Sequence, residues 1–367
     1  MPAPSAPRSP RAPPILPRTR SLPPTPDLSS RPRQTSAFRD ARVVRSRDPA
    51  ALAPCDAVLD VGGIYDPATR RYDHHQRGFD ETMKELGRSV KLSSAGLVYR
   101  HWGKEVIAAR LGLVAPGAEA KSGDADAARL DEIFRRVYVG FVEALDAVDN
   151  GVDRHETASP ARYDDATSLP ARVGRLNPPW NAPAAGDGSP AAANADLDAR
   201  FEVASALAGS EFMECVDRIG KVWLPARDVV RAALESREAD TSEACGGRVV
   251  VLARPCPWKE HLTDLEEEMG LTAGKDGTNV LFVLFRDDRE GKWRVQAVNE
   301  PGSFALRRGL PAAWRGLRDA ELDAAAGAEP HGVEPGCVFV HAAGFIGGHE
   351  TREGALAMAA AGVATDD

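Results

Sequence analysis

The chain has 367 residues, of which 43% are apolar and 27% are charged, and its formal net charge is −8. This composition excludes a disordered or fibrous protein, and the length favours two domains of about 150 residues each. The negative charge excludes binding to nucleic acid through the overall field, so such binding would need a local basic patch. No stretch approaches the ~18 consecutive apolar residues of a membrane-spanning helix.

Residues 1–39 differ in composition from the rest of the chain. They are crowded with proline, serine and arginine, contain a single acidic residue, Asp27, and show no apolar periodicity. Such a segment cannot bury enough apolar surface to offset the entropy that ordering costs, so we predict a disordered tail. The arginine-rich, acid-poor composition also fits an organelle transit peptide, although the prolines disfavour the amphipathic helix of an import signal.

Residues 40–195 alternate strands with helices. The short apolar runs 41–46 and 57–61 are typical of buried strands. Two helices are predicted, over 93–113 and 130–151; a pair of serines suits the cap of the first, and the second has the three-and-four spacing of a buried stripe. This alternation predicts an α/β domain with a parallel sheet and helices on its faces.

The second half of the chain changes from helix to strand. A long polar connection over 158–196 is rich in proline and glycine, and a helical connector is predicted over 196–245, with a new helix beginning near Pro225. Residues 246–367 are strand-rich, with a hairpin turn at 287–291 and a final glycine turn that leads into a helix. We therefore predict a smaller α+β domain.

A polar cluster follows the second predicted strand. Asp60 ends that strand, and Gly62 and Gly63 after it permit a tight turn. Carboxylates at the carboxyl ends of parallel strands lie where open α/β sheets bind their ligands. The alternative is an aspartate that only forms the turn.

The segment from Arg70 to Phe79 places Asp73, His74 and His75 in a row. Imidazoles and carboxylates ligate divalent metals, and a carboxylate beside a ligating histidine can fix its tautomer. Two adjacent histidines after an aspartate are therefore better explained by a metal site than by two solvent-exposed rings. Arg77 could hold a phosphate through paired hydrogen bonds, or could be a solvated surface charge.

Asp146 and Asp149 lie three residues apart at the end of the predicted helix 130–151, so they share one face. Negative charge there opposes the helix dipole, and a bound cation would compensate for it, although the sequence is also a common helix exit. Asp60, His74 and Asp149 together could bind a hard divalent cation, and their oxygen and imidazole ligands suit Mn²⁺ or Mg²⁺ better than a thiolate metal. Two such ions would support in-line phosphoryl displacement.

The segment "VLDVGGIYDPATRRYDHHQRGFDETM" resembles the third motif of the DHH phosphoesterase superfamily, which is named for Asp-His-His. More narrowly, the chain resembles the melanocyte-proliferating-gene-one exonuclease family of that superfamily. The motifs that carry this resemblance occur in order and include "KLSSAGLVYRHWG", "VEALDAVDNG", "RVGRLNPPWN", "PGSFALRRGLP" and "VFVHAAGFIGGHETREGALAMA". The resemblance covers nearly everything from Phe38 to Gly362. It implies a DHH-type domain followed by a smaller DHH-associated domain.

The resemblance implies a nuclease that depends on Mn²⁺ or Mg²⁺, acts 3′→5′ on RNA and releases nucleoside monophosphates, in mitochondria and the nucleus. It implies that Asp60, His74 and Asp149 ligate metal and that His75, with Asp73, acts at the scissile phosphate. In the second domain it implies that the segment "GFIGGH" and the helix after it hold the 3′-terminal nucleotide. The residues concerned are Gly344, Gly347, Gly348, His349 and Arg352.

The resemblance also implies an opening loop of the form His-Asn-Gly-x-Phe-His-x-Asp-Glu that supplies further metal ligands, and this sequence contains no such segment. The sequence is then either an incomplete gene model or splice form, or a variant that has lost one ion. We expect weak or absent activity and an unpaired sheet edge. The alternatives to a nuclease are a hydrolase of small phosphoanhydrides or oligonucleotides, and a non-catalytic RNA-binding protein.

Overall fold

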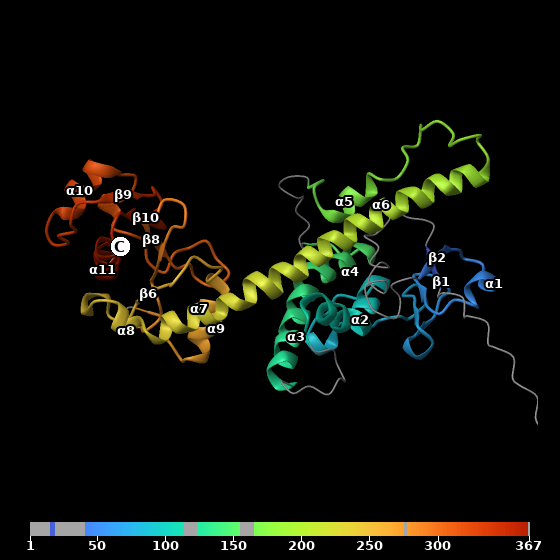
Figure 1. The fold of residues 1–367 in the computed structure, drawn as a ribbon, viewed down its shortest axis with the longest axis horizontal. Coiled ribbons are helices and arrows are strands. Elements are labelled where there is room, and N and C mark those ends of the chain that lie inside the picture. Colours follow the sequence, from blue (N-terminus) through green and yellow to red (C-terminus); the bar gives the residue numbers. More distant parts are fainter. Residues whose placement is uncertain (1–14, 19–40, 114–122, 155–164, 275–276, 366–367) are drawn as a thin grey trace, which may run out of the picture. The chain divides into compact units, whose positions relative to one another are not determined.

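The computed structural model describes residues 15–18, 41–113, 123–154, 165–274 and 277–365. It divides into two compact units, Met1–Lys221 and Val222–Asp367, so the division falls inside the predicted helical connector (Figure 1). Among the described helices, none combines the length and the apolar character needed to cross a membrane.

The first unit contains two small sheets. In one, β1 (Ile15–Arg18) pairs in parallel with β2 (Arg42–Arg45). In the other, the spatial order is β3 (Val58–Leu59), β5 (Arg71–Tyr72) and β4 (Tyr65–Asp66). β3 and β5 are parallel, whereas β4 and β5 are antiparallel. The fold is thus mixed α/β, and the predicted strands exist, but in two sheets rather than one.

The strand β1 corrects one expectation. We predicted that residues 1–39 form no structure, yet Ile15–Arg18 within them form a strand. β1 pairs with β2 in a sheet of its own, and among the described strands β3 lies at the edge of the three-stranded sheet. The other residues of the predicted tail lie outside the described ranges.

Helices make up most of the first unit. They are α1 (Pro49–Leu52), α2 (Ser94–Leu111), α3 (Gly123–Val137), α4 (Glu143–Asp149), α5 (Leu169–Gly174) and α6 (Pro190–Asp217). A π-helical segment, Tyr138–Val142, joins α3 to α4, and a second one, Arg218–Trp223, follows α6. The Ser93 hydroxyl caps α2 by accepting from the Ala95 N–H, and Gly112 ends it with a φ of +69°.

Aromatic side chains fill the core between these helices. Tyr99 of α2 stacks on Phe134 of α3 with ring centroids 4.5 Å apart, and Phe212 of α6 meets Tyr99 edge-on. The buried Tyr99 hydroxyl donates to the Phe134 carbonyl oxygen. The apolar stripe predicted from residue 130 onward therefore packs on α2 and α6, and it fixes α4 beside the start of α2.

The second unit is built on one five-stranded sheet. Its strands are β6 (Val249–Val251), β7 (Phe282–Arg286), β8 (Trp293–Ala297), β10 (Ile346–His349) and β9 (Cys337–Val340), in that spatial order. β6 and β7 are parallel, and the other neighbours are antiparallel. The predicted hairpin turn at 287–291 joins β7 to β8, where the Asp287 N–H donates to the Lys292 carbonyl oxygen.

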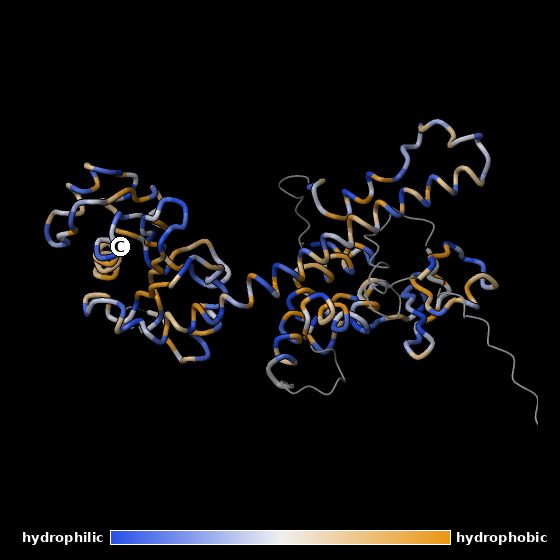
Figure 2. Tube along the Cα trace, in the orientation of Figure 1, coloured by the Kyte–Doolittle hydropathy of each residue, from blue (hydrophilic) through white to orange (hydrophobic). Residues whose placement is uncertain are grey.

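Both faces of this sheet are covered, because successive residues of its strands enter different cores. Phe282 and Leu284 face one apolar cluster, and Val283 between them faces the other. The first cluster includes α10 (Asp319–Gly327) and α11 (Arg352–Ala364). The second includes α7 (Leu224–Glu235) and α9 (Lys259–Glu268), and the short α8 (Arg237–Asp240) follows α7. The apolar colouring of β6 and β7 in Figure 2 reflects this double burial.

Candidate metal centre

The ends of two parallel strands bring the first candidate residues together. β3 and β5 pair with Leu59 opposite Tyr72, so Asp60 and Asp73, which follow them, lie at the same edge of the sheet. The Asp60 N–H donates to the Tyr72 carbonyl oxygen. Asp60 has a φ of +61°, in the left-handed region that favours glycine. Asp60 thus follows the carboxyl end of a parallel strand, and Asp73 lies beside it.

Asp73 is buried, and both of its carboxylate oxygens already accept hydrogen bonds. Oδ2 accepts from the Gly63 N–H at 2.6 Å, and Oδ1 accepts from the His74 N–H at 2.8 Å and the His75 N–H at 3.1 Å. Burial raises the pKa of Asp73, but the hydrogen bonds from Gly63 and His75 outweigh it and lower the pKa below its usual range. Asp73 is therefore an ionised group that holds the loop and orients its neighbours.

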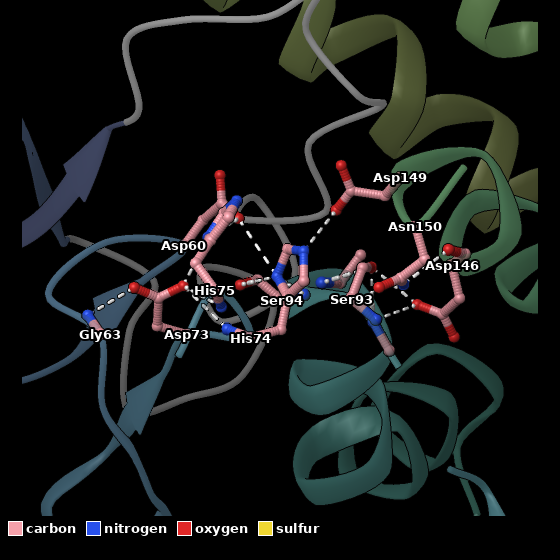
Figure 3. Close-up of polar contacts among 12 residues, drawn as sticks. Asp60, Gly63, Asp73, His74, His75, Ser93, Ser94, Asp146, Asp149 and Asn150 are labelled. Atoms are coloured by element: carbon pink, nitrogen blue, oxygen red, sulfur yellow. Dashed lines mark hydrogen bonds and ion pairs between the residues drawn. The ribbon is translucent and has the colours of Figure 1, made fainter. Parts of the chain in front are cut away.

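His74 lies between two carboxylates (Figure 3). Its Nδ1 is 3.5 Å from Asp60 Oδ1, and its Nε2 is 3.5 Å from Asp149 Oδ2. Nδ1 also accepts from the Ser94 N–H at 3.1 Å and lies 3.2 Å from Ser94 Oγ. Burial, with the nearby charges of His75 and Lys91 and against that of Asp73, lowers the pKa of His74 to about 4, so the ring is neutral near pH 7. A neutral imidazole is the form that ligates a metal.

His75 is the exposed member of the pair, with 53% of its side chain accessible. Its Nδ1 lies 2.7 Å from Asp73 Oδ1, which fixes that nitrogen as the donor because Asp73 is ionised. Its ring packs against the ring of His74 with centroids 4.2 Å apart. Asp73 therefore sets the tautomer of His75 and leaves its Nε2 as the reactive nitrogen.

Asp146 and Asp149 have different roles although they are three residues apart on α4. Asp146 is fully buried; its Oδ1 accepts from the Ser93 N–H at 3.0 Å and from the Ser93 hydroxyl at 2.7 Å, and its Oδ2 accepts from the Tyr138 hydroxyl at 3.1 Å. It thereby fixes the start of α2, where the next residue, Ser94, contacts His74. Asp149 alone reaches the candidate site.

A glycine makes the contact between α2 and α4 possible. A Cβ added at Gly96 would lie 2.3 Å from a carboxylate oxygen of Asp146. The Asn150 side chain completes the contact, because its Nδ2 donates to the carbonyl oxygens of Lys91 and Asp146. The sequence analysis did not identify these supporting residues, because their spacing along the chain gives no signal of contact.

Four side chains can offer one ligand atom each within 4.8 Å of one another: Asp60, Asp73, His74 and His75. Asp149 is not among these four, but its carboxylate faces His74 Nε2. The carboxylate and imidazole donors fit a divalent metal ion. The side chains that could hold an ion together are therefore Asp60, Asp73, His74 and His75, while Asp149 lies at the other ring nitrogen of His74 from Asp60.

Two basic residues lie near the centre. Arg77 is exposed, and among the described residues it makes no hydrogen bond or ion pair. Lys91, which the sequence analysis did not select, lies with its ammonium 5.4 Å from the centre of the Phe79 ring. The Phe79 ring in turn meets the ring of His74 edge-on at 6.4 Å. Both cations are available to a phosphate.

Only part of the predicted glycine turn of the second unit is a turn in the structure. Gly347 and Gly348 are inside β10, which pairs on both sides, so the chain is a strand at these positions. His349 is fully buried: Nε2 lies 3.0 Å from the Glu334 carbonyl oxygen, and Nδ1 accepts from the Thr351 N–H. Gly344 forms a turn with a φ of +70°, and Arg352 begins α11.

Residues 32–363 match the family model MYG1_exonuc, described as "Uncharacterised protein family (UPF0160)". Over 334 residues the chain is 45% identical to the MYG1 exonuclease of Homo sapiens, an alignment that covers 89% of this chain and 79% of the human protein. It is 46% identical to the MYG1 exonuclease of Mus musculus, with 89% and 78% covered. It is 40% identical to the MYG1 protein of Dictyostelium discoideum, with 88% and 87% covered. No solved structure matches the chain.

Proposed function

The chain belongs to the MYG1 exonuclease family, as its motifs predicted, and on that basis we propose that it is a divalent-metal-dependent 3′→5′ exonuclease of RNA that releases nucleoside monophosphates. The observation that carries the proposal is the group of aspartates and histidines around His74. The proposed ligands are Asp60, His74 and Asp149, and the proposed ion is Mn²⁺ or Mg²⁺.

In this structure Nδ1 of His74 accepts from the Ser94 N–H, so the ring proton lies on Nε2, which faces Asp149 Oδ2 at 3.5 Å. If Nε2 ligates the ion, the proton must move to Nδ1, where Ser94 Oγ at 3.2 Å and Asp60 Oδ1 at 3.5 Å can accept it. The ion, when bound, would lower the pKa of a water molecule and stabilise the charge on the phosphate. Asp146 supports this arrangement indirectly because it fixes Ser93, which precedes Ser94.

His75 is the proposed acid–base residue at the scissile phosphate. Its Nδ1 proton is donated to Asp73, so its accessible Nε2 can exchange a proton or donate to a phosphoryl oxygen. Asp73 acts only through His75 and the loop. Arg77 is proposed to contact the RNA backbone, and Gly344, Gly347, Gly348, His349 and Arg352 are proposed to shape the site of the 3′-terminal nucleotide.

We propose a single ion and weak turnover, because the engaged oxygens of Asp73 leave few ligands in the described part of the chain. The test uses RNA labelled at its 5′ end, with Mn²⁺, and follows the products by length. Stepwise shortening with release of monophosphates supports the proposal. Calorimetry of Mn²⁺ binding gives a second readout that does not need turnover.

Variants assign the site. His74→Ala and Asp149→Asn should lose Mn²⁺ binding by at least about tenfold, since even the loss of residues that only support a ligand costs about 10–100-fold. Asp153→Asn is the matched control: this exposed aspartate follows Asp149 by four residues and has no described partner. Equal Mn²⁺ affinity in all three variants would contradict the proposed ligands.

The same small number of ligand residues favours a second candidate, a non-catalytic RNA-binding protein. It predicts salt-dependent RNA binding without products, unchanged in His74→Ala and Asp149→Asn. Release of inorganic phosphate from phosphoanhydrides, with long RNA left intact, would instead indicate a small-molecule hydrolase. A mitochondrial or nuclear location is also proposed, and imaging of the full chain with a fluorescent protein at its C-terminus tests it.

A further inference from the structure

A separate cavity lies at one edge of the sheet in the second unit. β6, β7 and β10 run in the same direction, because β7 and β10 are each antiparallel to β8 and β6 is parallel to β7. Their carboxyl ends therefore meet at one edge, beside the first residue of β8. Open α/β sheets bind their ligands at such edges. A cavity of about 610 Å³ is found there, large enough for a small organic ligand.

Three arginines line this cavity from three different elements. Arg254 follows β6, Arg286 ends β7 and Arg352 begins α11. Arg254 is exposed and forms no hydrogen bond or ion pair with any described residue. Arg286 donates from Nε to the Gly291 carbonyl oxygen and Arg352 from Nη2 to the Asp240 carbonyl oxygen, so each keeps further N–H donors. Guanidinium groups that line the same cavity suit a phosphate.

The rest of the lining consists of a tryptophan, several apolar residues, a serine and two aspartates. Trp293, the first residue of β8, is partly buried and lines the cavity. Val229 and Ala232 of α7 supply apolar surface. Asp228 and Ser236 supply polar groups that could form hydrogen bonds with the hydroxyl groups of a ligand. A bare phosphate would not use the indole or the apolar wall, and a purely apolar ligand would leave the arginines unpaired. A nucleotide uses every part, since its base stacks on aromatic rings and its ribose hydroxyls donate to carboxylates.

We propose that this cavity binds one nucleotide, with the phosphate on Arg254, Arg286 and Arg352 and the base on Trp293. The proposal rests on the proposed function for the choice of a ribonucleotide, and it assigns the cavity to a nucleotide of the RNA or to the released monophosphate. The ionisable residues of the lining are three arginines and two aspartates, Asp228 and Asp240, so their net charge is positive. A positive cavity favours an anionic ligand such as a nucleotide.

The test measures binding of UMP and AMP to the full chain by calorimetry in the presence of EDTA. EDTA removes divalent ions, so the metal centre of the first unit does not contribute. Inorganic phosphate is the second probe. We expect both nucleotides to bind at least about fivefold more tightly than phosphate, because stacking on an aromatic ring contributes about 1–3 kcal/mol and each 1.4 kcal/mol is about tenfold.

Variants locate the binding. Arg254→Ala should weaken UMP binding by at least about tenfold without unfolding, because Arg254 is exposed and unpaired among the described residues. Arg231→Ala is the control, an arginine of α7 that pairs with Glu268 and does not line the cavity. Equal UMP affinity in both variants would overturn the proposal, as would phosphate binding as tightly as UMP. Trp293→Phe should remove the change in tryptophan fluorescence that accompanies binding.

The nuclease assay separates this proposal from the proposed function. If the wild-type chain degrades RNA, Arg254→Ala should raise KM and leave kcat nearly unchanged. RNA degradation with an unchanged KM and no UMP binding would refute the cavity proposal while the nuclease stands. UMP binding that Arg254→Ala weakens, in a chain that leaves RNA intact, would refute the nuclease and support the cavity.

Discussion

The two aspartates of α4 give the sharpest prediction, because they are three residues apart and only one is buried. Replacing Asp146 by alanine should destabilise the first unit by about 3 kcal/mol. Replacing Asp149 by alanine should cost less than about 1 kcal/mol, since its side chain is partly exposed and its negative charge opposes the dipole at the end of α4.

The magnitude follows from the three donors that Asp146 satisfies. The Ser93 N–H cannot rotate to another acceptor, and leaving a buried donor unpaired costs about 1–3 kcal/mol. The hydroxyls of Ser93 and Tyr138 can rotate, so each loses only the net value of its bond, about 0.5–1.5 kcal/mol. The alanine variant no longer has to bury a carboxylate, and this gain offsets part of the cost of the three lost hydrogen bonds.

The assay is urea unfolding in EDTA, monitored by hydrogen exchange of peptides from α2 and α4. These peptides report the unfolding of the first unit alone. Mn²⁺ binding is measured on the same variants and should give a different pattern. Asp149→Ala should retain the wild-type urea midpoint and lose the ion. If Asp146→Ala keeps the wild-type midpoint and the wild-type exchange of α2, the assignment of Asp146 as the support of Ser93 is wrong.

Three further predictions concern other positions. Asp60→Gly should leave the stability of the first unit unchanged or raise it by up to about 1 kcal/mol, because glycine adopts the φ of +61° without strain, yet Mn²⁺ binding should be lost; a large fall in the thermal midpoint would contradict this. In EDTA the stability of the first unit should be full above pH 6.5 and should fall by about 3 kcal/mol as the pH drops toward 4, since His74 has a pKa of about 4 in the fold and its ordinary value of 6.5 when unfolded; His74→Gln should remove this part of the urea-midpoint profile. Arg307→Met should destabilise the second unit by about 3–5 kcal/mol, because it leaves Glu266 buried without its partner, and the double variant Glu266→Gln, Arg307→Met should recover part of that loss in the same urea titration.

The sequence predicted those elements whose signals are local. α2 was expected because serines precede it, and the structure uses Ser93 as its cap. α7 was expected near Pro225, and it begins at Leu224 with that proline in its first turn. The hairpin between β7 and β8 was expected from its turn residues. In each case the residues that specify the element lie within a few positions of it.

The misses have a common cause, which is dependence on partners far along the chain. Gly347 and Gly348 suggested a turn, but β10 is a strand because β8 and β9 flank it. Gly347 has no room for a side chain, since a Cβ there would lie 2.8 Å from Leu310. The hydrogen bonds that Asp73 accepts from Gly63 and Asp146 accepts from Ser93 were not predicted either. Pairings of this kind leave no periodicity to detect.

The backbone at Asp60 strengthens the case that its carboxylate is used. A left-handed φ costs a residue with a side chain about 1 kcal/mol, so glycine would be favoured there if only the turn mattered. Gly62 and Gly63, which follow at once, also have positive φ, so this turn takes glycine at other positions. Of the two carboxylates at the strand ends, Asp73 is occupied by the loop, and Asp60 lies 3.5 Å from His74. An aspartate with a left-handed φ beside a neutral imidazole supports the proposal that this pair binds a cation.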